Sequence, residues 1–163
     1  MMNINSLLAG VVFIGFGGAL AIPDAAPQAV PNDQLTPGAV ASQDIAAVCG
    51  FVGGLSYSKR HRATPYELKR SIRERDGCGR NSEVDHRLPL ALGGEDSEPN
   101  LWCQPGASTW TYHDKDRLEV YYWEQVCKHH AMPLAAAQAQ FLAPSNWIER
   151  YCGVWPNDAR CAK

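Results

Sequence analysis

The sequence predicts an α+β fold in which a strand, a long loop, a second strand and a helix follow one another, braced by additional helices and by disulfides. Two short segments, residues 83–90 and 101–104, have the length and apolar content of strands, and a Gly-Gly pair and a polar loop separate them. Proline and capping residues mark helices on both sides of them. Six cysteines, an even number, favour crosslinks in a chain of 163 residues.

The chain begins with a segment typical of export. Residues 1–21 are uncharged and mostly apolar, and Ala19-Leu20-Ala21 has the small-x-small pattern of a cleavage site, so we expect a signal peptide and a secreted or periplasmic protein. Because this segment has no Lys or Arg, an uncleaved membrane anchor is the alternative. Residues 22–37 are rich in Ala and Pro and predict a flexible linker. Residues 38–163 are then one folded domain.

The first helix is predicted from its boundaries. Thr64 can cap it, Pro65 suits its first position, and Glu67 completes a capping box. Gly77 ends it, so we expect a helix over residues 64–76.

Three helices are expected after the second strand. Capping residues at 108–111 open one that runs to about residue 127, with Asp114 in its first turn. Two shorter helices are expected over residues 133–141 and 145–151, and a proline separates them.

Four polar residues carry the candidate chemistry: Asp85, His86, Asn100 and His113. An imidazole titrates near neutral pH, so His86 can serve as a general base. The Asp85 carboxylate offers a hard oxygen to a divalent cation. His113 lies in the first turn of a helix, where the positive helix end disfavours imidazolium and leaves a nitrogen free to bind metal.

Asn100 has both donors and an acceptor, so it can tie the long loop to the strand and orient His86. Asp85 and His86 are neighbours in a strand, and in a regular strand their side chains point to opposite faces. One groove therefore holds both only if the backbone twists or bulges at this point.

These segments resemble a known family. His86, Asn100 and His113 are similar to the His-Asn-His signature of HNH endonucleases, and Asp85-His86 matches their Asp-His pair. A group of small bacterial HNH proteins has Asp-His-x-x-Pro-Leu-x-Leu-Gly-Gly, then Asn-Leu-Trp, then Lys-Asp-x-Leu-Glu. This chain has the three patterns at residues 85–94, 100–102 and 115–119. The resemblance extends over residues 36–151, through Thr36-Pro37-Gly38, Cys49, Lys69 and Cys127.

The resemblance implies a ββα-metal (His-Me finger) motif and an HNH nuclease that hydrolyses phosphodiester bonds, with DNA as the expected substrate. By this resemblance, His86 is the base, and Asp85 and His113 bind one divalent metal ion. Mg or Mn is expected, and Zn or Ca is the alternative. We expect a monomer with no membrane partner after cleavage of the signal. The alternative function is an exported, disulfide-stapled nucleic-acid-binding module with a decayed nuclease fold.

The charge distribution also predicts a surface that binds nucleic acid. The net charge is −2, but residues 59–87 contain nine basic and five acidic residues, and a local positive face can steer a polyanion. A solvated helix surface is the alternative. Arg87 stands where the family usually has an apolar residue. The residues expected to contact phosphates are Lys69, Arg70, Arg73, Arg87 and Lys115.

Six cysteines allow 15 pairings, and composition alone selects none of them. Comparison with the family pattern narrows the choice. Cys103 replaces a proline of that pattern and Cys78 is absent from it, which suggests that these two are paired across the hairpin. Near its end the chain also has two closely spaced cysteines, Cys152 and Cys161, which suggest a further short-range disulfide. The expected disulfides are Cys78–Cys103, Cys152–Cys161 and, from the remaining two, Cys49–Cys127.

Overall fold

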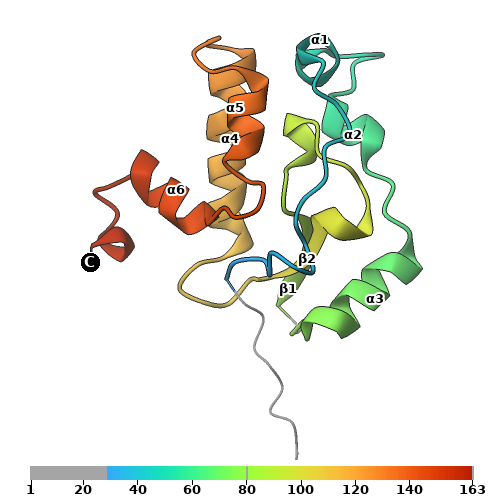
Figure 1. Ribbon diagram of the computed structural model, residues 1–163, viewed down its shortest axis with the longest axis vertical. Coiled ribbons are helices and arrows are strands. Elements are labelled where there is room, and N and C mark those ends of the chain that lie inside the picture. The colour runs from blue at the N-terminus through green and yellow to red at the C-terminus, as the bar shows by residue number, and fades with distance from the viewer. Residues whose placement is uncertain (1–28, 80, 163) are drawn as a thin grey trace, which may run out of the picture.

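A two-stranded antiparallel sheet lies between helices in the computed structural model, which describes residues 29–79 and 81–162 (Figure 1). Strand β1 (Ser82–His86) pairs with β2 (Leu101–Pro105), so that Asp85 lies opposite Trp102. The predicted α+β class is confirmed. Within the described residues the helices are α1 (Ile45–Cys49), α2 (Tyr57–His61), α3 (Tyr66–Asp76), α4 (Tyr112–Cys127), α5 (Leu134–Ala139) and α6 (Trp147–Val154).

The longer helices lie where the capping residues place them. α4 begins at a capping box, in which the Thr111 hydroxyl and backbone N–H both contact the Asp114 carboxylate. The capping box predicted for α3 is wrong, because Thr64 donates its hydroxyl to Asp96 instead and Pro65 occupies the N-cap without a side-chain bond. α1 and α2 were not predicted, since helices of five residues are too short to show an apolar periodicity.

The first strand is shorter than the predicted segment 83–90 and ends at His86. The Asn100 amide donates to the Leu88 carbonyl at 2.9 Å and accepts from its N–H at 2.8 Å. These are the backbone groups that a continuing strand would offer to a partner, and Pro89 has no N–H at all. The chain turns instead into a 3-10 helix, Leu90–Leu92, and the loop then returns to β2.

Two apolar clusters hold the sheet to α3 and α4. Ile72 of α3 is buried against Val84 and Leu101 of the strands. Leu118 and Val126 of α4 are fully buried in the larger cluster. Full burial of such side chains stabilises the fold by roughly 1.5–3 kcal/mol each. The first turns of α4 are therefore held at a fixed position beside β1.

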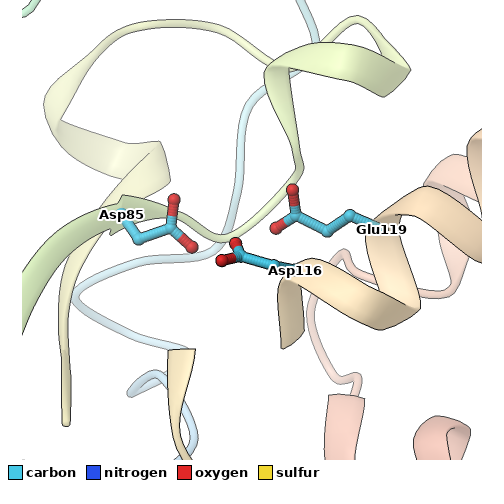
Figure 2. Close-up of side chains that lie close together, drawn as sticks. All are labelled: Asp85, Asp116 and Glu119. Carbon is cyan, nitrogen blue, oxygen red and sulfur yellow. The ribbon is translucent and has the colours of Figure 1, made fainter. Parts of the chain in front are cut away.

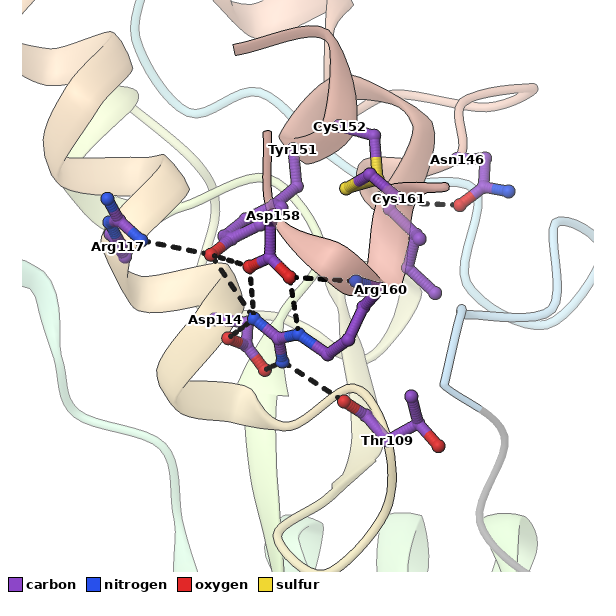
Figure 3. Close-up of a disulfide and its surroundings, with 10 residues drawn as sticks. Thr109, Asp114, Arg117, Asn146, Tyr151, Cys152, Asp158, Arg160 and Cys161 are labelled. Atoms are coloured by element: carbon purple, nitrogen blue, oxygen red, sulfur yellow. Dashed lines mark hydrogen bonds and ion pairs between the residues drawn. A yellow bond between two sulfur atoms is a disulfide. The ribbon is translucent and has the colours of Figure 1, made fainter. Parts of the chain in front are cut away.

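All six cysteines are paired, and the three predicted disulfides are confirmed. Cys49–Cys127 joins the ends of α1 and α4, and Cys78–Cys103 joins the end of α3 to β2. The third, Cys152–Cys161, closes the C-terminal segment on α6 (Figure 3).

The described part of the predicted linker, residues 29–37, packs on the domain. The Thr36 side chain is buried, and the Ala29 carbonyl accepts from Trp147 Nε1 at 2.7 Å. The folded region therefore begins before residue 38. The predicted signal peptide, residues 1–21, lies outside the described residues. Among the helices of the described ranges, none has the length and apolar character needed to cross a bilayer.

Candidate active site

β1 places Asp85 and His86 side by side in the interior, where they are 5% and 2% exposed. His86 is the last residue of the strand. Its Nδ1 lies 3.9 Å from Asp85 Oδ1, so the two side chains approach each other at the point where regular pairing ends. His86 Nδ1 is buried and has no hydrogen-bond partner among the described residues.

α4 brings two further carboxylates to Asp85. Asp116 and Glu119 are three residues apart, so they share one face of the helix. Asp85, Asp116 and Glu119 each place one oxygen within 4.8 Å of the others, and Figure 2 shows the three carboxylates pointing toward one another from β1 and α4. We call these three residues the acidic cluster.

Lys115 is the cation of this region and is 1% exposed. Its ammonium donates to Asp85 Oδ2 at 2.6 Å and also to Glu119 Oε1. The side chain therefore ties β1 to the second turn of α4. One ammonium faces three carboxylates, so the acidic cluster retains an excess of negative charge.

The pKa shifts follow this imbalance. Burial alone would raise the pKa of Asp85, but the Lys115 ammonium lowers it well below its usual range. Burial raises the pKa of Glu119, and Asp85 and Asp116 add to the effect despite the contact with Lys115. Burial and Asp85 also raise the pKa of Asp116. For both carboxylates on α4, burial and the neighbouring carboxylates outweigh the opposing effect of the nearby cations.

Asn100 organises the loop that leads into this region. It is fully buried, and its side chain bonds both backbone groups of Leu88, the Glu95 carbonyl at 2.8 Å and the Ala39 N–H at 3.4 Å. It therefore ties the long loop to the end of β1, as its donors and acceptor predict. Its hydrogen bonds go to backbone groups and none goes to the His86 ring.

Asp96 was not singled out from the sequence. It lies in the loop between the strands, and its Oδ1 is 2.7 Å from His86 Nε2. The same carboxylate accepts from the Ala63 N–H at 2.6 Å and from the Thr64 hydroxyl. Burial alone would raise the pKa of Asp96, but the bonds from Thr64, Ala63 and His86 lower it.

His113, the third residue that the resemblance implies, lies one helical turn before Asp116. It is exposed in the first turn of α4, and its ring centroid is 4.2 Å from that of Tyr112. In the described part of the chain, the group of three donors within 4.8 Å of one another consists of the acidic cluster and does not include His113. The structure therefore brings Asp116 and Glu119, rather than His113, to Asp85.

Two of the expected phosphate-binding residues are buried inside the protein. Arg87 donates to the backbone carbonyls of Phe141, Thr36 and Ser145 and pairs with Asp33 at 2.6 Å. Lys115 is equally buried and engaged by the carboxylates around it. The expectation that these two contact phosphate is corrected, because each cation is buried and already engaged by carbonyl or carboxylate oxygens of the protein. The basic residue at position 87 joins distant segments of the chain.

The other three expected residues are exposed on α3. Arg70 pairs with Glu67 at 2.8 Å, Lys69 has no ion pair within the described residues, and Arg73 lines a polar groove. The groove has a volume of about 480 Å³, and Glu83 and Tyr112 line its other side. It therefore extends from α3 to the start of α4.

No known protein family, curated protein or solved structure matches this chain. The function must therefore be argued from the side chains of the chain itself. Asp116 and Glu119 belong to the Lys-Asp-x-Leu-Glu segment, and their three-residue spacing on a helix is the signal that could have assigned them as ligands. Asp96 gave no such signal, because its role depends on the path of the loop.

Proposed function

We propose that the protein is a metal-dependent endonuclease of the HNH type, in which β1, β2 and the start of α4 form a ββα-metal motif and phosphodiester bonds, chiefly of DNA, are hydrolysed. One observation carries this proposal. His86 Nδ1, a buried nitrogen without a hydrogen-bond partner in the described part of the chain, lies beside Asp85 of the acidic cluster. A base and a group of metal-binding oxygens adjacent to each other are what water activation at a phosphate requires.

The residues present fit a divalent metal ion. Lys115 occupies one oxygen each of Asp85 and Glu119, so negative charge and donor oxygens remain in the acidic cluster. Three carboxylates form an oxygen donor set, which favours Mg²⁺ or Mn²⁺, accepts Ca²⁺ and suits Zn²⁺ least. We therefore assign the ligands as Asp85, Asp116 and Glu119, and retain His113 as a nitrogen that could join them. When bound there, the ion would polarise the phosphate and stabilise the leaving oxygen.

Side chains of the protein accept the proton, position the loop and bind the phosphates. His86 accepts a proton from the attacking water at Nδ1, which contributes roughly 10²–10⁴ in rate. Asn100 holds the loop that covers the end of β1. Lys69, Arg70 and Arg73 contact phosphates along α3, and Arg73 does so in the polar groove.

We also propose that the protein acts as a monomer outside the cytosol. Its three disulfides support the location outside the cytosol, because such crosslinks persist in oxidising compartments. The apolar segment 1–21 is the proposed export signal.

The test uses the oxidised, full-length chain with supercoiled plasmid and with RNA, in Mg²⁺, Mn²⁺, Ca²⁺ or Zn²⁺. Nicking in Mg²⁺ or Mn²⁺ is expected. His86→Ala should slow it by roughly 10²–10⁴ and keep Mn²⁺ affinity in calorimetry. Asp116→Asn and Glu119→Gln should weaken Mn²⁺ binding, and excess Mn²⁺ should restore part of their rate. The control is Glu124→Gln, which changes a half-exposed acid on the same helix that pairs with Lys128, and it should change neither.

His113→Ala distinguishes the two ligand sets. Full Mn²⁺ affinity in this variant supports the all-oxygen set, whereas loss of affinity restores His113 as a ligand. Nucleic-acid binding with no cleavage in any metal, and no Mn²⁺ binding, would contradict the proposal. That result supports the alternative of a disulfide-stapled binding module.

A further inference from the structure

The hydrogen bond from His86 to Asp96 decides which ring nitrogen is free. His86 Nε2 and Asp96 Oδ1 are 2.7 Å apart, and both side chains are largely buried. An ionised carboxylate only accepts hydrogen bonds, so Nε2 must carry the proton that lies between them. In a neutral imidazole the other nitrogen, Nδ1, then has a free lone pair.

Asp96 is itself held in the ionised form by its surroundings. The Ala63 N–H donates to Oδ2 at 2.6 Å and the Thr64 hydroxyl donates to Oδ1. These donors, together with His86, hold the pKa of Asp96 below its usual range although burial opposes this. Because Ala63 and Thr64 lie in the linker between α2 and α3, a distant segment orients the carboxylate toward the histidine.

The free nitrogen faces the acidic cluster. His86 Nδ1 is buried, has no hydrogen-bond partner within residues 29–79 and 81–162, and lies 3.9 Å from Asp85 Oδ1. A ring with Nε2 tied to Asp96 and Nδ1 beside Asp85 cannot rotate without breaking the hydrogen bond to Asp96. Both the tautomer and the orientation of His86 are therefore set from the side of the ring opposite to the acidic cluster.

We infer that Asp96 is the positioning residue of His86, which holds the ring as its Nε2–H tautomer and leaves Nδ1 as the proton acceptor. The catalytic part of this inference rests on the proposed nuclease function, whereas the tautomer does not. Asp96 acts through His86 and touches neither water nor phosphate. This arrangement places the Asp96 carboxylate and the acidic cluster at opposite edges of the His86 ring.

Asp96→Asn tests the inference because it should reverse the tautomer. The Ala63 N–H is a fixed donor, so the Asn carbonyl oxygen stays on that side. The amide NH₂ group then takes the place of Oδ1 and faces His86 Nε2. Nε2 becomes an acceptor, the ring proton moves to Nδ1, and the base loses its lone pair. Glu98→Gln, in the same loop, is the matched control, because the exposed Glu98 carboxylate contacts Arg75 and not His86.

Long-range ¹H–¹⁵N correlation spectra of the metal-free, oxidised full chain report the tautomer directly, at a pH where the imidazole is neutral. The His86 signals are assigned by their absence in His86→Gln. Wild type and Glu98→Gln should show Nε2–H, and Asp96→Asn should show Nδ1–H. An Nδ1–H tautomer in the wild type overturns the inference, and so does an unchanged tautomer in Asp96→Asn. If Asp96→Asn fails to fold, the tautomer seen in the wild-type spectrum is sufficient to support or overturn the inference.

Kinetics give the second readout. Asp96→Asn should lower the kcat of plasmid nicking by about 10²–10⁴ while KM and Mn²⁺ affinity stay unchanged. The double variant with His86→Ala should be no slower than His86→Ala alone, because Asp96 acts only through His86. Additive losses overturn the positioning role. If the wild type cleaves nothing, the proposed function fails, and the spectra still decide the role of Asp96.

Discussion

The first turns of α4 belong to two charged clusters that differ in their balance. The acidic cluster has three carboxylates and the buried ammonium of Lys115, and it runs from buried Asp85 through half-buried Glu119 to exposed Asp116. The C-terminal ion cluster consists of Asp114, Asp158 and Arg160 and lies near the surface (Figure 3). In it one guanidinium reaches both carboxylates, at 3.0 Å and 2.7 Å.

The pKa values diverge accordingly. Bonds from Arg160 hold the pKa of Asp158 low, and they do the same for Asp114 against the opposing effect of burial. In the acidic cluster the pKa values of Asp116 and Glu119 are raised instead. A planar guanidinium with several donors satisfies its carboxylates, whereas one ammonium among three carboxylates leaves a charge that a metal ion could neutralise. The imbalance distinguishes a candidate metal site from a structural ion network.

The largest effect is expected from Lys115→Met. It removes the buried Lys115 ammonium and leaves Asp85 and Glu119 without this counter-charge, so the free energy of unfolding should fall by about 3–5 kcal/mol. Mn²⁺ should restore part of the loss and raise Tm more than in the wild type. Lys128→Met removes an exposed pair on the same helix and should cost below about 1 kcal/mol. Equal losses, or no response to Mn²⁺, would show that the acidic cluster needs no cation.

An intermediate effect is expected from the double variant Cys152→Ser/Cys161→Ser. It releases a loop with a sequence separation of 9, which should cost roughly 2–3 kcal/mol in urea unfolding. Because Arg160 lies inside this loop, the C-terminal ion cluster loosens, but the acidic cluster does not use it. Mn²⁺ affinity should therefore stay unchanged in calorimetry. A tenfold weaker Mn²⁺ affinity would mean that the Cys152–Cys161 disulfide helps to hold the acidic cluster in place.

The smallest effect concerns acid stability. The pKa of Asp158 is lower in the folded protein than the ordinary carboxyl value of 3.8. The stability that this adds is present above that value and is lost as pH falls through the folded pKa. Arg160→Gln should therefore flatten the decline of Tm between pH 5 and pH 3 relative to the wild type. Parallel Tm curves for the two proteins would show that Arg160 does not set the pKa.

The features that depend on local sequence were predicted well. The hairpin, the start of α4 at a capping residue within 108–111 and the pairing of all six cysteines agree with the expectations. Capping and turn residues act within a few positions along the chain, so their effect is visible in the sequence.

The features that depend on the long loop were not predictable. The predicted strand continues to residue 90, but the Asn100 side chain replaces the strand pairing of Leu88. Asp96 contacts His86 because the loop folds back over Thr64. Arg87 resembled a surface cation and is instead enclosed by carbonyls from segments far away in sequence. Tertiary contacts of this kind override local propensity.

The buried Arg87 has a consequence for how the chain is made. Its guanidinium needs the carbonyl of Ser145, which is 58 residues further along the chain. A ribosome adds roughly 5–20 residues per second, so the arginine waits about 3–12 s for its last acceptor. The contacts of Arg87, the residue that follows His86, are therefore incomplete during that interval. The last of them forms only after residue 145 has been added to the chain.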